Sequence, residues 1–207
     1  MIHLNKVHRY GLEALKELPI RETQIFDDAS DYWEDLIGYD DELKADLIET
    51  KYLEMDVLIR IHNQFSFASA FASFEHTLSR RAEAMMRNAQ SPFVLRDLSD
   101  KGLRRARKVM SKVAGLGGLF ELEEWKSIET YELPRHKIVH AGGLVELGSE
   151  DEKKLKKQHA FRMRCYGDGT SFAQIEVSDD LVLAVFWNFK KFLEKLEVNL
   201  RGAPKQC

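Results

Sequence analysis

Hydrophobic residues recur at helical intervals through most of the 207-residue chain. The clearest pattern predicts a helix over residues 67–88, because its apolar positions follow one another at intervals of three, four and seven. A more broken pattern predicts a helix over 41–62, and another is expected over 24–37, with Gly38 between these two. Pro92 closes this helical region. The stripe within 67–88 consists of Phe67, Ala70, Phe71, Phe74, Leu78 and Met85.

The next segment predicts a helix over residues 101–114. Ser99 or Asp100 is available as its N-cap, because a short polar side chain there accepts a hydrogen bond from a free backbone N–H. Gly115 suits the first position beyond the helix, where the backbone often turns left-handed. A glycine-rich loop over 115–118 then reverses the chain.

Residues 119–133 predict a further helix, which Pro134 follows directly. The proline either kinks this helix or occupies the first turn of a new one. Because Leu133 would be a poor N-cap, a kink or a tight junction is favoured. Gly142 and Gly143 end the helical stretch.

A β-hairpin is expected before the last helix. Apolar and polar residues alternate over 161–165 and again over 173–177, and the turn-forming residues 167–170 lie between them. Ser178 and two aspartates begin a final helix, which carries a broad apolar stripe over 182–200. The sequence therefore predicts a mainly α fold with one small hairpin.

The length and composition indicate a single domain over 1–207. It is expected to have an acidic extension over 1–40, a core bundle over 41–200 and a tail over 201–207. No apolar stretch is long enough to span a bilayer, and the N-terminus lacks the apolar core of a signal peptide. Two cysteines form neither a disulfide framework nor a metal-ligand cluster, so a cytoplasmic location without membrane contact is expected.

The formal net charge of −3 argues against an indiscriminate nucleic-acid binder, but the charges are unevenly distributed. Residues 22–56 hold thirteen acidic residues against two lysines, and this segment would repel phosphate. Two basic clusters could bind a phosphate backbone or be ordinary solvated helix faces. The first lies in 101–112 and contains Lys101, Arg104, Arg105, Arg107, Lys108 and Lys112; the second contains Lys153, Lys154, Lys156 and Lys157.

The residues most capable of chemistry lie just before Gly142. His136 and His140 are one helical turn apart and therefore project from the same side of a helix. Arg135 lies about 140° from His140 around an ideal helix, but its long side chain can swing towards the same edge. Cleavage of RNA without metal requires a base, an acid and positive charge on the phosphorane. Two histidines and an arginine can supply all three.

At these residues the chain resembles the HEPN superfamily, whose signature is R-x(4–6)-H with a polar residue directly after the arginine. Arg135, His136 and His140 match its three positions, and a preceding amphipathic helix and a following glycine agree with it. The resemblance implies a HEPN-like bundle of four to five core helices covering roughly 41–200, with N-terminal helices before it. It also implies a homodimer that brings two motifs into one cleft.

Many HEPN proteins are ribonucleases of toxin–antitoxin or phage-defence systems. The resemblance therefore implies a metal-independent RNA endonuclease, with RNA as substrate, no cofactor, and an antitoxin or other defence protein as a further partner. A non-catalytic HEPN-like module that binds RNA, nucleotide or a partner protein is the alternative. Two departures stand out: Gly142 occupies the position of a tyrosine that some members carry, and Pro134 precedes the arginine.

Other interpretations of the motif compete with this one. His136 and His140 have the spacing of a helical zinc pair, but Lys137 stands where a metalloprotease needs glutamate, so no metal is expected. Both histidines could also serve a purely structural role. Secondary candidates for substrate binding are Glu75, Arg80, Arg104, Arg105 and Lys108.

Overall fold

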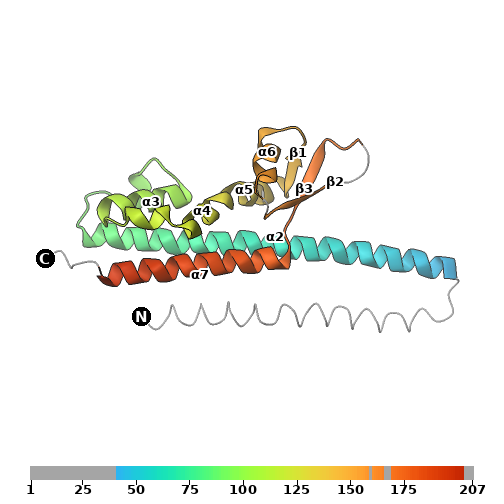
Figure 1. Cartoon of the computed structure of the whole chain (residues 1–207), viewed down its shortest axis with the longest axis horizontal. Helices are drawn as coiled ribbons and strands as arrows, with labels where there is room; N and C mark the ends of the chain where they lie inside the picture. The colour runs from blue at the N-terminus through green and yellow to red at the C-terminus, as the bar shows by residue number, and fades with distance from the viewer. Residues whose placement is uncertain (1–40, 159, 166–168, 203–207) are drawn as a thin grey trace. The chain divides into compact units, whose positions relative to one another are not determined.

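The computed structural model describes residues 41–158, 160–165 and 169–202 (Figure 1). The predicted helix over 24–37 and the acidic extension over 1–40 lie outside the described residues, as does most of the predicted tail. The chain divides into two units, Met1–Leu58 and Ile59–Cys207. The first is described only through residues 41–58, which begin helix α2.

Helix α2 is a single continuous helix, Asp41–Asn88, where two separate segments over 41–62 and 67–88 had been predicted. This stretch contains neither glycine nor proline, so nothing in it breaks the backbone hydrogen bonds. The interruption of the apolar stripe near residue 63 marks a change in what the helix faces and is not a helix end. From Phe67 onwards the stripe is buried, as predicted.

The basic segment forms α3, Gly102–Val113, after the short 3₁₀ helix η1, Leu95–Asp97. The predicted N-cap was wrong: Lys101 holds this position and its side chain caps nothing. Asp100 instead accepts a hydrogen bond from Lys108 Nζ at 2.8 Å. The helix end was predicted correctly, since Gly115 has φ +68°.

The segment predicted as one helix over 119–133 is divided into shorter elements, so that prediction was wrong. A 3₁₀ helix, η2, spans Gly117–Glu121, and α4 spans Glu123–Thr130. Tyr131 then forms a tight junction to α5, Glu132–Ala141. Pro134 lies in the first turn of α5, where its missing N–H costs no helical hydrogen bond.

The predicted hairpin is present and belongs to a larger sheet. Strands β2, Arg162–Cys165, and β3, Phe172–Glu176, pair antiparallel with Met163 opposite Ile175. The prediction missed a third strand, β1, Leu144–Glu146, which pairs with the other edge of β3. It also missed the short helix α6, Glu150–Lys156, between β1 and β2.

The last helix, α7, spans Asp179–Gly202 and begins as predicted, with Ser178 Oγ accepting a hydrogen bond from the Leu181 N–H at 3.3 Å. The described chain is therefore mainly helical, with a small antiparallel sheet before its last helix, which confirms the predicted fold class. None of the helices in the described residues is long and apolar enough to cross a membrane.

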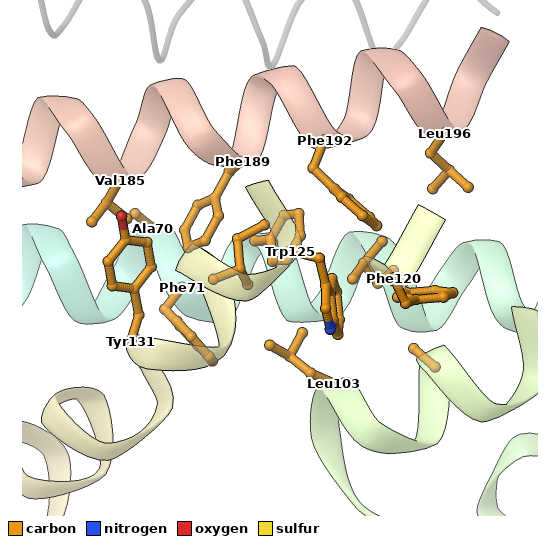
Figure 2. Close-up of a cluster of buried hydrophobic side chains, with 14 of the residues drawn as sticks. Ala70, Phe71, Leu103, Phe120, Trp125, Tyr131, Val185, Phe189, Phe192 and Leu196 are labelled. Atoms are coloured by element: carbon orange, nitrogen blue, oxygen red, sulfur yellow. The ribbon is translucent and has the colours of Figure 1, made fainter. Parts of the chain in front are cut away.

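Aromatic side chains form the centre of the core within the second unit. Figure 1 shows α7 running alongside the second half of α2, with α3, α4 and α5 arranged along this pair. Phe189 of α7 stacks on Phe74 of α2 with ring centroids 4.3 Å apart. Trp125 of α4 is buried against Phe192 of α7, with centroids 5.1 Å apart (Figure 2). This packing fixes α4 and, through it, the start of α5.

Candidate functional site

The two motif histidines lie side by side on the exposed face of α5. The imidazole centroids of His136 and His140 are 4.6 Å apart, with the ring planes inclined by 48°. Both side chains are exposed. Because both rings are exposed, a ligand can reach them. Two imidazoles at this separation can also transfer protons to and from a single bound group, which suits acid–base chemistry.

Arg135 packs towards α2. Its guanidinium carbon lies 5.8 Å from the ring centroid of Phe71, and the residue is half-buried. Its Nε is buried without a hydrogen-bond partner, and none of the carboxylates that the structure describes forms an ion pair with it. The structure thus brings the two imidazoles together, whereas Arg135 packs on Phe71 and no described contact joins it to them, so the expected swing of its side chain to the histidine edge is not observed.

A hydrogen bond fastens the N-terminal end of α5 to α7. Asn188 Nδ2 donates to the Tyr131 hydroxyl oxygen at 2.7 Å. Burial raises the pKa of Tyr131, so its ring remains neutral within the core. Tyr131 also packs edge-on against Phe67 and Phe161. The residue directly before α5 is therefore fixed by elements from three parts of the chain.

The C-terminal end of α5 is fixed by a turn that requires glycine. Gly142 and Gly143 have φ values of +60° and +81°. The Gly143 N–H donates to Lys137 O at 3.0 Å, and the Gly143 carbonyl accepts from the Ile175 N–H at 2.9 Å. Gln64 Nε2 donates to Ile175 O at 2.9 Å, and a Cβ atom on Gly143 would lie 2.7 Å from that nitrogen. A larger residue at 143 would therefore displace Gln64.

Helix α6 lies against α5 and contributes a carboxylate. Lys137, directly after His136, forms an ion pair with Asp151 at 2.6 Å, and both side chains are partly buried. The Lys137 hydrogen bond lowers the pKa of Asp151, and the charges of Lys154 and His136 act in the same direction. The Glu152 carboxylate accepts from the Gly148 N–H at 2.6 Å and so fixes the start of α6.

The basic residues predicted on α3 are largely engaged with neighbouring acids. Lys108 pairs with Asp100, and Arg105 Nε donates to the Asp100 carbonyl. Arg104 is highly exposed, at 79%, and its guanidinium Nη2 lies 3.7 Å from Glu132 Oε2 at the start of α5. Burial raises the pKa of Glu132, against the opposing effect of Arg104. Arg104 thus joins the basic cluster to the motif helix through Glu132.

The remaining secondary candidates lie on α2. Arg80 is exposed and makes no ion pair with any residue that the structure describes. Glu75 approaches Gly102, where its Oε1 would lie 3.0 Å from an added Cβ atom. The structure does not bring either side chain to the imidazole pair by a described contact.

Sequence reasoning missed two residues that support the site, Asp151 and Gln64. Ser149 followed by three acidic residues is a helix-start signal that could have located α6 and with it Asp151. Gln64 carried no comparable signal, because its partner Ile175 is 111 positions away.

Over the described ranges no three His, Cys, Asp or Glu side chains gather as a metal site would require. Comparisons with models of known families, with curated proteins and with solved structures find no match to this chain. Any assignment of function consequently depends on the geometry of α5 and its neighbours.

Proposed function

We propose that this chain is a metal-independent RNA endonuclease of the HEPN type, with its reaction site on α5. The exposed pair His136 and His140, 4.6 Å apart, is the observation that supports this most directly. Two imidazoles on a single helix face can act as base and acid on one phosphodiester. Arg135 has no carboxylate partner among the described residues, and in this proposal its guanidinium turns from Phe71 towards the bound phosphate to supply the positive charge.

The proposed reaction is transesterification within the RNA strand. One imidazole removes the proton of the ribose 2′-hydroxyl, and the 2′ oxygen forms a bond to phosphorus. The bond from phosphorus to the 5′ oxygen then breaks, and the second, protonated imidazole gives its proton to that leaving oxygen. The products end in a 2′,3′-cyclic phosphate and a 5′-hydroxyl. Arg135 stabilises the extra negative charge on the phosphorane.

We propose further that two copies of the chain pair so that their α5 faces meet. A phosphate between them would contact two imidazole pairs, and the exposure of both histidines leaves this face free for such an arrangement. An antitoxin or other defence protein is the proposed regulating partner. The competing proposal, a non-catalytic module binding RNA, nucleotide or protein, uses the same face without the proton transfers.

Purified full-length protein incubated with mixed RNA in EDTA tests this function. The parent protein should cleave, and His140→Ala should lose cleavage by about 100- to 10,000-fold. His62→Ala is the matched control, because His62 is also an exposed histidine on a helix but lies outside the motif. Equal cleavage by the parent and His140→Ala would remove this histidine from the mechanism, and loss of all cleavage in EDTA would contradict a metal-independent reaction.

A further inference from the structure

The lysines of α6 are not equivalent. Lys153 pairs with Glu150 at 2.6 Å, and Lys156 pairs with Glu152 at 2.6 Å. Each of these charges is compensated within the same helix. Lys154, between them, is exposed and forms no ion pair with any side chain in the described part of the chain. Its ammonium is therefore available to an anion in solution.

Lys154 also lies on the side of α6 that faces the motif helix. It follows Asp151 by three positions, which places both residues on one helix face. Asp151 is bound to Lys137 of α5 at 2.6 Å. The charges of Lys154 and His136 both lower the pKa of the Asp151 carboxylate, as expected if both lie near it.

Among the three lysines within α6, Lys154 is the one without a described ion pair. Asp151 compensates the positive charge of Lys137, and no second acid among the described residues does the same for Lys154. Building on the proposed function, we propose that Lys154 binds a backbone phosphate of the RNA next to the scissile one. Lysine is a compact charge on a flexible stem and contacts phosphate without reading the base, so this contact is independent of RNA sequence.

Direct titration of RNA onto cleavage-deficient protein tests the proposal. A labelled single-stranded RNA is titrated with His140→Ala, His140→Ala/Lys154→Ala and His140→Ala/Lys153→Ala, so that no cleavage occurs. Lys153→Ala is the matched control, because it removes a neighbouring lysine that is paired with Glu150. Circular dichroism establishes that the three proteins are equally folded.

Removing Lys154 should weaken binding by about 3- to 10-fold at moderate salt. The dependence of log Kd on log salt should become shallower by about 0.7, the value for one phosphate contact on a single strand. Lys153→Ala should leave both quantities nearly unchanged. Equal affinities and slopes for the Lys154 and Lys153 variants would overturn the proposal.

The outcome separates this proposal from the proposed function. If EDTA-resistant cleavage depends on His140 but Lys154→Ala binds normally, the enzyme stands and the phosphate contact at Lys154 fails. If Lys154→Ala weakens binding while the parent protein and His140→Ala cleave RNA equally, the phosphate contact stands and the proposed catalysis fails.

Discussion

Gln64 of α2 and Gly143, at the end of α5, lie so close together that a Cβ atom on Gly143 would stand 2.7 Å from Gln64 Nε2. The amide cannot withdraw freely, because it donates to Ile175 O at 2.9 Å and is buried. This contact lies in the turn that ends the motif helix, three residues after His140. It therefore connects a core position on α2 with the placement of the imidazole pair.

The substitution Gly143→Ala should destabilise the fold by about 2–4 kcal/mol. The added Cβ imposes the strain of a positive φ and also disrupts a buried hydrogen bond. Gly142→Ala is the control, because Gly142 has a positive φ but nothing lies within 4 Å of its added Cβ. That variant should lose only about 1 kcal/mol. Urea denaturation of the two variants measures the difference in their free energies of unfolding. Equal decreases would show that the Gln64 side chain moves aside without loss of stability.

The hydrogen bond between Asn188 and Tyr131 should contribute measurably to stability. Tyr131→Phe removes the acceptor and leaves the amide of Asn188 without its partner, at a cost of about 1–2 kcal/mol. Tyr52→Phe, at an exposed tyrosine, should change stability by less than about 0.5 kcal/mol. A double-mutant cycle with Asn188→Ala measures the coupling, and additive losses would contradict a direct interaction.

The Lys137–Asp151 pair predicts a pH-dependent difference in stability. The pKa of Asp151 is lowered in the folded chain, so the Lys137–Asp151 pair stabilises the folded state above about pH 4. This stabilisation is lost as the pH falls through the folded-state pKa. Asp151→Asn should therefore lower the urea midpoint at neutral pH and approach the parent in acid. Glu150→Gln, in an exposed pair with Lys153, is the control. A difference that grows towards low pH would contradict this sign.

Arg135→Lys should separate charge from geometry at the proposed reaction site. The variant keeps the positive charge but loses the planar fork that matches phosphate oxygens. If the guanidinium stabilises the phosphorane, kcat should fall by about 100-fold with little change in KM. Arg96→Lys, at an exposed arginine of η1, should cleave like the parent. A rise in KM at constant kcat would assign Arg135 to ground-state binding.

The sequence patterns predicted the elements that bury a regular apolar face. The stripe from Phe67 to Met85 and the stripe on α7 both became core, because residues three and four apart meet the same neighbouring helix. The capping signal at Ser178 and the alternation around Met163 also located their elements correctly. The pairing of His136 with His140 followed from a spacing of one helical turn.

The features that sequence reasoning missed depend on contacts distant in the chain. Strand β1 has three residues and owes its existence to its pairing with β3. The break at Tyr131 has no glycine to mark it; it is held by Asn188, 57 positions away. The orientation of Arg135 towards Phe71 likewise required the position of α2. Local periodicity carries no information about such partners.

The motif helix is anchored at both extremities, by Asn188 at its beginning and by the Gln64–Ile175 contact at its close. The rotation of this helix about its own axis is therefore fixed by contacts within a single chain, when that chain folds. Any incoming molecule meets rings that are already aligned, so little backbone entropy remains to be lost upon docking. Loosening of either anchor would let the helix turn about its own axis, and activity would then decline on warming before the protein melts.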